Sequence, residues 1–314
     1  MHRRYFLATV SAGAAGLATG GLPNLMATSN SSSTFQLGGD LTVHRLGFGA
    51  MRITGEGIWG WPPDKENAKK VLRRALELGV NLIDTADAYG PETSELLIAE
   101  ALHPYPKDLV IATKGGIVRP SRDEWVPNGR PEHLAQAVDA SLKRLKLDRI
   151  DLYQLHTVDR RVPLEESLGA LKKAQEAGKI RHVGLSNVKT SEIERARKIL
   201  PIVSIQNEYN LANRKSESVL LYCEREKLGF IPWYPLGGDR SRLLKHGTAL
   251  EAEAKRLNAS SAQLALAWLL QKSPVMLPIP GTASLQHLED NIAAAKLQLT
   301  PADCQTIESL AKRA

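Results

Sequence analysis

Cysteine is scarce in this chain, which has only Cys223 and Cys304 among its 314 residues. Both fall in predicted helices, and two cysteines indicate neither a disulfide framework nor a cysteine-based metal site. The spacings His-x-x-x-His and Cys-x-x-Cys are also missing, so we predict no bound metal.

Dense basic blocks are absent as well, although the net charge is +7. Their absence argues against nucleic-acid binding. The mild positive excess fits either an anionic cofactor or lysines dispersed over the surface. A hydrophobic content of 43% is ordinary for a soluble globular protein.

No apolar run is long enough to predict a stable membrane span. The first residues nevertheless have the order of a secretory signal, with Met1-His-Arg-Arg-Tyr-Phe-Leu7 before an Ala/Gly-rich run. The paired arginines resemble a twin-arginine signal. We therefore expect residues 1–33 to be a leader cleaved near Ala27, and the protein to be exported to the periplasm. A cytoplasmic location, if the leader is inefficient, and a disordered or membrane-touching tail are the alternatives.

Strand and helix patterns alternate through the remaining residues, 34–314, which we expect to form one domain. A hairpin is predicted at residues 35–43. Strands are predicted at residues 46–50, 81–83, 109–114, 150–156, 180–186, 202–206, 230–234 and 275–279. Helices are predicted at residues 65–78, 93–102, 131–146, 164–177, 190–199, 214–227, 248–257, 261–271, 284–294 and 301–312.

Eight apolar strands followed by helices are typical of a parallel sheet covered by helices. Length and repeat number favour a single (β/α)8 TIM barrel, with an N-terminal hairpin and extra C-terminal helices, over an open doubly wound sheet. Gly47-Phe-Gly49 lacks the third glycine of the dinucleotide-binding fingerprint and lies within a strand, which argues against the open sheet.

Ionisable residues stand at or just beyond the ends of three consecutive strands: Asp84, Tyr89, Lys114 and His156. In a parallel barrel these strand ends share one face, so the four side chains should converge there. Around a carbonyl group, Tyr89 would donate the proton, and Lys114 would favour the phenolate by Coulomb attraction. Asp84 would keep Lys114 charged, and His156 would orient the substrate oxygen. Taken singly, each also fits a structural role, as an ion pair, a packed aromatic ring or a core histidine.

These four residues, with Asp84-Thr-Ala-Asp-Ala-Tyr89 as a motif, resemble the tetrad of the aldo-keto reductases. Three further segments are similar to the family: Arg181-His-Val-Gly-Leu-Ser-Asn187, Ile205-Gln-Asn-Glu-Tyr209 and Pro278-Ile-Pro-Gly-Thr282. The resemblance extends from about Gly47 to Asn291 and is closest to a bacterial branch related to pyridoxal reductases. It implies NAD(P)H-dependent reduction of an aldehyde or ketone to an alcohol, or the reverse, with Tyr89 as general acid.

The resemblance also implies the cofactor contacts. Ser186, Asn187 and Gln206 would hold the nicotinamide carboxamide, and Trp233 would stack on its ring unless it is only a core residue. The loop containing Leu236, Gly238, Arg240 and Arg242 would clasp the pyrophosphate. The segment with Gly281, Thr282, His287 and Asn291 would grip the adenosine phosphate. Members that strongly prefer NADP often have Lys and Arg at the positions of Gly281 and His287. We still favour NADP(H) over NAD(H).

The predicted substrate pocket contains Met51, Trp59, Trp61 and Trp125, which would form an apolar wall for a small carbonyl substrate. We expect a monomer or a small oligomer. One alternative function is an NADP-binding sensor or regulatory subunit of the same fold, like the potassium-channel β subunits. Another is a barrel glycosidase, which requires two carboxylates roughly 5–9.5 Å apart.

Overall fold

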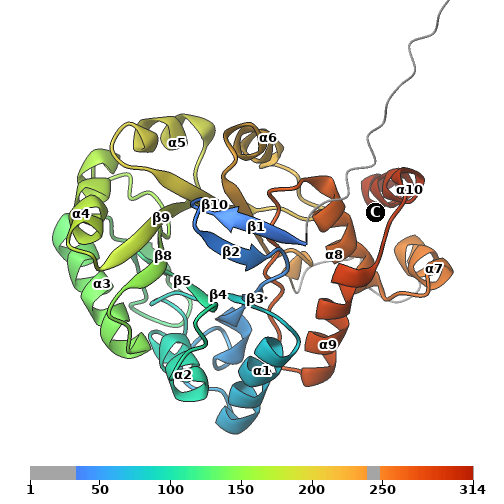
Figure 1. Cartoon of the computed structure of the whole chain (residues 1–314), viewed down its shortest axis with the longest axis horizontal. Coiled ribbons are helices and arrows are strands. Elements are labelled where there is room, and N and C mark those ends of the chain that lie inside the picture. The colour runs from blue at the N-terminus through green and yellow to red at the C-terminus, as the bar shows by residue number, and fades with distance from the viewer. Residues whose placement is uncertain (1–32, 239–247, 314) are drawn as a thin grey trace, which may run out of the picture. The chain divides into compact units, whose positions relative to one another are not determined.

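The computed structural model describes residues 33–238 and 248–313. In this part of the chain, parallel strands form a seven-stranded sheet in the order β11–β10–β9–β8–β5–β4–β3. The sheet curls around a central axis and helices surround it, while the β1–β2 hairpin lies across one end (Figure 1). The prediction of a (β/α)8 barrel with an N-terminal hairpin and extra C-terminal helices is confirmed.

The strands have the following bounds: β1 Thr34–Leu37, β2 Leu41–His44, β3 Phe48–Gly49, β4 Leu82–Asp84, β5 Val110–Gly115, β6 Ile117–Val118, β7 Val126–Pro127, β8 Ile150–Leu155, β9 Ile180–Ser186, β10 Ile202–Glu208 and β11 Gly229–Trp233. The α-helices are α1 Lys65–Glu77, α2 Thr93–Leu102, α3 Pro131–Leu145, α4 Leu164–Glu176, α5 Thr190–Arg197, α6 Glu217–Glu226, α7 Ala249–Arg256, α8 Ser261–Lys272, α9 Leu285–Ala293 and α10 Pro301–Arg313. Two short 3-10 helices are η1 Ala50–Ile53 and η3 Ala294–Lys296.

The predicted eighth strand is not a regular strand, but its segment closes the barrel. The Leu277 N–H donates to the Phe230 carbonyl on β11 (2.8 Å), and the Gly47 N–H, just before β3, donates to the Pro278 carbonyl (2.9 Å). Proline has no N–H group, so Pro278 and Pro280 can only accept hydrogen bonds. The segment therefore connects both edges of the sheet without forming a complete ladder.

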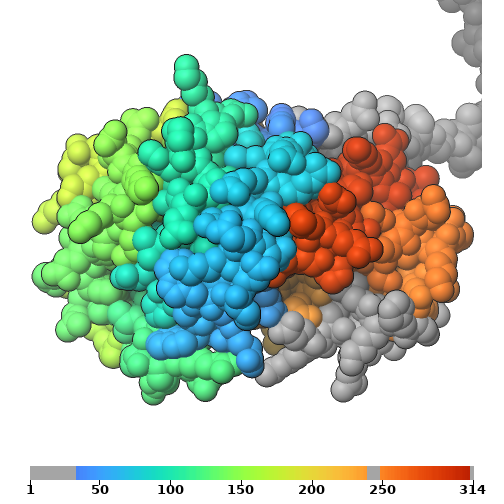
Figure 2. All heavy atoms as spheres, turned by 90° about the horizontal axis from the view of Figure 1, so that it is seen from below, coloured from blue at the N-terminus to red at the C-terminus, as the bar shows by residue number. Residues whose placement is uncertain are grey.

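Helix α1 shows how the outer layer is built. The Asp64 side chain caps it by accepting a hydrogen bond from the Asn67 N–H (2.8 Å). Its buried apolar residues pack against the sheet in one core cluster: Ala68, Val71, Leu72 and Ala75. Although α1 and α9 are far apart in the sequence, they pack side by side (Figure 2). Between them, Arg74 pairs with Glu289 (2.8 Å).

The alternation of side chains along each strand determines which residues face the barrel interior. In β5, Ile111 packs towards the helices while Ala112 belongs to the interior cluster, so Lys114, two residues later, also points inwards. In β8, Leu152 faces the interior, and Gln154 follows it on the same side. The hairpin fills the opposite end of this interior, contributing Leu37, Leu41 and Val43. The interior is therefore apolar near the hairpin and polar at the carboxyl ends of the strands.

Two predictions concern residues that the structure does not describe. The proposed leader lies outside the described residues apart from Ser33, and so do Arg240 and Arg242 of the predicted pyrophosphate clasp. Within the described ranges, no helix combines the length and apolarity that crossing a lipid bilayer requires.

Candidate active site

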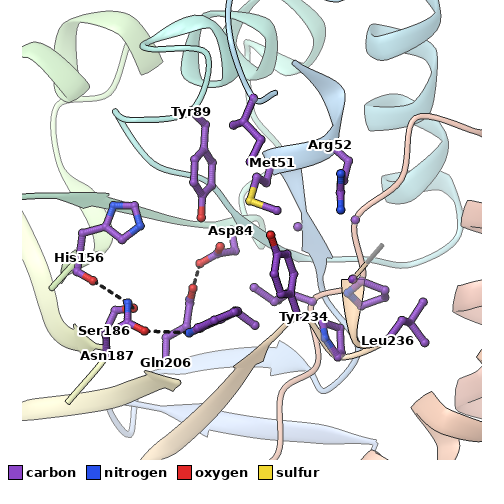
Figure 3. Close-up of a pocket in the computed structure, with 18 of the residues that line it drawn as sticks. Met51, Arg52, Asp84, Tyr89, His156, Ser186, Asn187, Gln206, Tyr234 and Leu236 are labelled. Atoms are coloured by element: carbon purple, nitrogen blue, oxygen red, sulfur yellow. Dashed lines mark hydrogen bonds between the residues drawn. The ribbon is translucent and has the colours of Figure 1, made fainter. Parts of the chain in front are cut away.

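A cavity of about 470 Å³ opens at the carboxyl ends of the strands. Most of these strands contribute a lining residue at, just after or within two residues of their last position: Gly49, Asp84, His156, Ser186, Gln206 and Trp233. Met51 and Arg52, which belong to η1, approach the cavity from the side opposite His156 (Figure 3). The site is therefore formed by strand ends on one side and by connecting loops on the other.

Three residues of the predicted tetrad, Asp84, Tyr89 and His156, line this cavity, and the buried Lys114 contacts two of them. The Lys114 ammonium donates hydrogen bonds to Asp84 Oδ1 (2.6 Å), to the Thr85 carbonyl (2.8 Å) and to the Tyr89 hydroxyl (3.4 Å). Tyr89 points its hydroxyl into the cavity towards Asp84 (Figure 3). Lys114 is fully buried, and Asp84 is only 2% exposed, so this ion pair is almost entirely removed from water.

Burial and the neighbouring charges have opposing effects on this pair. Burial alone would lower the pKa of Lys114, but attraction and hydrogen bonds from Asp84 and Tyr89 raise it above its ordinary value. Lys114 is therefore positively charged at neutral pH. Burial raises the pKa of Tyr89, and the attraction of Lys114 offsets only part of this increase. The expectation of an acidified phenol is therefore wrong for this structure: Tyr89 keeps its proton at neutral pH.

His156 lies directly after β8 and forms the far wall of the cavity. Burial, reinforced by the positive charge of Lys114, holds the pKa of His156 well below its ordinary value. The imidazole is consequently neutral, with one nitrogen able to donate and the other to accept. Its ring packs edge-on against Tyr89, with centroids 5.8 Å apart. A polar oxygen held near the Tyr89 hydroxyl is therefore also close to a neutral histidine.

The second carboxylate oxygen of Asp84 is held by two side-chain amides. Gln206 Nε2 donates to Asp84 Oδ2 (2.7 Å), and Gln154 Nε2 donates to the same oxygen (3.2 Å). Gln154 is not among the site residues predicted from the sequence. Strand periodicity is the signal that would have found it, because Gln154 precedes His156 by two residues and so faces the same side.

On the side predicted for the nicotinamide, Asn187 is the central residue. Its Nδ2 donates to the His156 carbonyl (3.1 Å), and its Oδ1 accepts from Trp233 Nε1 (3.0 Å). Its φ of 58° is left-handed, a conformation that asparagine tolerates better than most residues. Ser186 and Gln206 line the cavity beside it. The structure thus brings together the predicted carboxamide-binding residues with Trp233.

Gly281, where a strongly NADP-preferring relative would have Lys, lies against the backbone of β3. A Cβ atom at this position would approach the Gly49 carbonyl oxygen to 2.4 Å, which no side chain tolerates without a backbone shift. This close backbone contact explains why the chain has glycine at position 281 and not the Lys that members with a strong NADP preference often have.

Three other residues predicted to grip the adenosine phosphate do not line the cavity. Thr282 precedes α9, His287 belongs to its first turn, and Asn291 is buried further along it. The Ser284 hydroxyl caps this helix by accepting from the His287 N–H (3.3 Å). Helix N-termini favour anions, so this end of α9 suits a phosphate. Leu236 and Gly238, in contrast, line the cavity itself.

The cavity lining includes only some of the residues predicted for the substrate pocket. Met51 and Trp125 line the cavity, but Trp59 and Trp61 do not. Trp61 is 40% exposed and lies against the Lys65 ammonium, which is 3.3 Å from the ring centroid. Other lining residues were not anticipated: Arg52, Ile58, Ile117, Tyr234, Pro235, Ile279 and Pro280.

The fold agrees with what comparison to known proteins shows. The family model described as "Aldo/keto reductase family" matches residues 45–312, and the chain belongs to that family.

Among its relatives is a protein of Schizosaccharomyces pombe described as an uncharacterized oxidoreductase, 53% identical over 262 residues, which cover 83% of this chain and 85% of the relative. The pyridoxine 4-dehydrogenase of Escherichia coli is 42% identical over 288 residues, covering 90% and 99% of the two chains.

Solved structures show the same architecture. The glycerol dehydrogenase of Gluconobacter oxydans has a TM-score of 0.80 at 26% identity, with 90% of this chain and 95% of that chain covered. An aldo-keto reductase of Klebsiella pneumoniae in complex with NADPH has a TM-score of 0.76 at 26% identity, covering 88% and 94%.

Proposed function

We propose that this protein reduces small aldehydes or ketones to alcohols with NADPH, and catalyses the reverse oxidation. The observation that carries this proposal is the buried Tyr89 hydroxyl, 3.4 Å from the Lys114 ammonium and directed into the cavity. A protonated phenol next to a fixed positive charge suits an oxygen that gains negative charge during the reaction.

The donor set of the cavity fits a nicotinamide cofactor. Asn187, Ser186 and Gln206 offer the donors and acceptors that a carboxamide requires, and Trp233 offers an aromatic ring beside them. When bound, the reduced nicotinamide supplies the hydride for the carbonyl carbon. Support for NADP(H) comes from two related aldo-keto reductase structures from Klebsiella pneumoniae, one in complex with NADPH and the other with NADP and acetate.

Residues of this chain would transfer the proton to the substrate oxygen. Tyr89 holds it until negative charge develops on the substrate oxygen, and donates it there as general acid. Lys114 stabilises the resulting phenolate, while Asp84 keeps Lys114 charged and in place. His156, being neutral, fixes the position of the substrate oxygen by a hydrogen bond.

The cavity favours this reaction over glycoside hydrolysis. Among the described residues that line it, Asp84 is the single acid, and its two oxygens are held by Lys114 and the two glutamines. A second carboxylate facing Asp84 across the cavity is therefore missing from the described lining, whereas glycosidases require such a pair.

For the substrate we propose an aldehyde of the pyridoxal type, because a relative that is 42% identical is named pyridoxine 4-dehydrogenase. The test measures NADPH and NADH consumption against an aldehyde panel that includes pyridoxal, with Tyr89→Phe as the matched variant. We expect faster turnover with NADPH than with NADH. Tyr89→Phe should lose about 10²–10⁴-fold in turnover while its Kd for NADPH stays within about twofold, since the ring remains in place.

Two results would contradict this proposal. Unchanged turnover in Tyr89→Phe would remove the phenol from proton transfer. A wild-type protein that binds NADPH without ever oxidising it would favour the sensor or regulatory function.

We also propose that residues 1–33 direct export, on the sequence pattern alone. Replacing both Arg3 and Arg4 with Lys should keep the protein in the cytoplasm, which cell fractionation would measure. An identical distribution of wild type and variant would contradict export by the twin-arginine route.

A further inference from the structure

Arg119 directly follows β6 and is only 8% exposed. It is a buried charged residue that belongs neither to the tetrad nor to the predicted pockets. Its guanidinium carbon lies 3.7 Å from the ring centroid of Trp125 and 5.4 Å from that of Trp59. A buried cation requires compensating partners, and the faces of tryptophan rings provide them. Because the guanidinium is planar, it stacks on such rings in a way that a lysine ammonium does not.

The same guanidinium connects three loops through backbone carbonyl groups. Nη1 donates to the carbonyls of Ile58 (3.2 Å) and Ala88 (3.2 Å). Nη2 donates to the carbonyls of Gly57 (3.4 Å) and Arg122. These acceptors belong to the loop after η1, the loop between β4 and α2 that carries Tyr89, and the loop between β6 and β7. Arg119 therefore fixes these loops relative to one another.

One of the loops holds a strained residue at the cavity wall. Ile58 lines the cavity and has a φ of 58°, a left-handed conformation that is rare for a β-branched residue. Its carbonyl accepts from both Arg119 and the Gly90 N–H (3.2 Å). Strained residues of this kind persist only when their surroundings hold them, and they are common at functional sites.

Trp125 forms the neighbouring part of this wall. Its ring is edge-on to both Tyr89 and His156, with centroids 6.4 Å away in each case. It also lines the cavity. Trp125 and Ile58 thus line the same cavity into which the Tyr89 hydroxyl points, and Arg119 contacts both of them.

We propose that Arg119 is a positioning residue that sets substrate specificity, by fixing Ile58 and Trp125 as an apolar wall for flat ring substituents. This inference rests on the proposed reductase function. It assigns to the site carbonyl compounds that carry an aromatic ring, and it predicts that short aliphatic aldehydes depend much less on the wall.

The test compares Arg119→Lys with the wild type on benzaldehyde and propanal, with NADPH as the reductant. Lysine keeps the charge and can still donate to carbonyl groups, but it loses the planar stack on Trp125. We expect kcat/KM for benzaldehyde to fall about tenfold more than kcat/KM for propanal, mainly through KM. The Kd for NADPH should stay within about twofold.

Trp125→Ala provides the second variant, and it also serves if Arg119→Lys does not fold, because Trp125 is 37% exposed. It should reproduce the selective loss on benzaldehyde, and adding Arg119→Lys to it should change the selectivity little further. Equal losses on both aldehydes, or a selectivity that Trp125→Ala leaves unchanged, would overturn the proposal. Calorimetric titration gives the Kd of both variants for benzaldehyde without requiring turnover. A weaker Kd would support the wall even if the protein proved not to be a reductase, so the two proposals can fail separately.

Discussion

The two ends of the barrel interior are built from the same strands but differ completely in chemistry. Near the hairpin, β4 and β5 present Leu82 and Ala112 to the interior. Two residues further along the same faces, they present Asp84 and Lys114. The comparison shows that one step of strand periodicity separates a packed core from a reactive site. Stability and chemistry are thereby divided between the ends of one sheet, as is typical of barrel enzymes.

The charged groups at the two ends differ just as clearly in their exposure to solvent. The Lys114–Asp84 pair is 0% and 2% exposed. At the hairpin end, Asp40 is 49% exposed and pairs with Arg181, which is 28% exposed (2.8 Å). Water screens the second pair but not the first, so the same kind of interaction should have very different effects when it is removed.

The largest effect should come from Lys114→Met. Removal of one partner from a buried pair leaves Asp84 charged and uncompensated, which costs about 3–5 kcal/mol in the free energy of unfolding. Turnover should fall about 10³-fold, because the phenolate of Tyr89 loses its stabilising charge. Thermal unfolding and NADPH consumption measure the two losses. The matched control is Lys179→Met, since Lys179 forms an exposed pair with Asp139 (2.5 Å) and should cost less than about 1 kcal/mol.

The double variant Lys114→Met/Asp84→Asn separates the two consequences. It removes the uncompensated charge, so it should regain most of the lost stability while turnover stays low. Recovery of turnover in the double variant would contradict a catalytic role for the pair. The pair would then have only a structural role, like the pairs at the hairpin end.

The second prediction concerns pH and His156. Because burial and Lys114 hold the pKa of His156 well below its ordinary value, kcat/KM for reduction should show no inflection near pH 6.5. Burial raises the pKa of Tyr89 above the ordinary value of a phenol, so its proton is present throughout neutral pH. Reduction should therefore be level from about pH 6 to 9, while alcohol oxidation, which needs the phenolate, should rise with pH.

His156→Gln should lower kcat/KM about tenfold without changing the shape of this profile, because glutamine keeps a neutral donor. If the wild type instead shows an inflection near pH 6.5 that disappears in His156→Gln, the histidine titrates in its ordinary range. The surroundings of His156 would then be open to solvent, like those of the charged groups at the hairpin end.

The site residues on strands could be predicted from the sequence, because strand periodicity and strand ends are recognisable from neighbouring residues alone. The positions of Asp84, Lys114 and His156 required only the recognition of three buried strands and the rule that parallel strand ends share a face. Most helix bounds agree within two residues for a similar reason. For example, α1 runs Lys65–Glu77 and the prediction was 65–78. The predicted eighth strand, in contrast, does not form a regular strand, because Pro278 within it and Pro280 just beyond it have no N–H group to donate.

The positions of the site residues in loops could not be predicted from the sequence. Trp59 and Trp61 looked like a pocket wall, but the loop turns through Gly57, Ile58 and Gly60, all at positive φ. These turns depend on contacts with distant segments, such as the bridge between Trp59 and Gly90. The pKa direction of Tyr89 failed for a related reason, since the extent of burial is a property of the assembled cavity.

The third prediction addresses Gln154, which stands between the two regions on β8. Gln154→Leu removes one of the two amides that hold Asp84 Oδ2 and should lower kcat about tenfold, the low end for the loss of one hydrogen bond to a charged group. Gln154→Glu, of the same shape, places a second negative charge there and should lose more. That additional loss should shrink as pH falls, because protonation of either carboxyl group ends the repulsion. Equal effects of both variants would argue against an electrostatic role.

The smallest effect should come from Asp40→Asn at the hairpin end. Burial opposes ionisation, but the hydrogen bonds and charges of His182 and Arg181 together outweigh it and hold the pKa of Asp40 below its ordinary value. A lowered acid pKa stabilises the fold above the unfolded pKa of about 4, and this contribution is lost as pH falls through the folded value. The variant should therefore lose about 0.5–1 kcal/mol at pH 7, seen as a Tm lower by about 1–4 °C, and nothing near pH 2. Turnover should stay within about twofold of the wild type, because the apolar interior separates Asp40 from the cavity. A larger loss of turnover than of stability would show that the two ends are coupled, and the division between packing and chemistry would not hold.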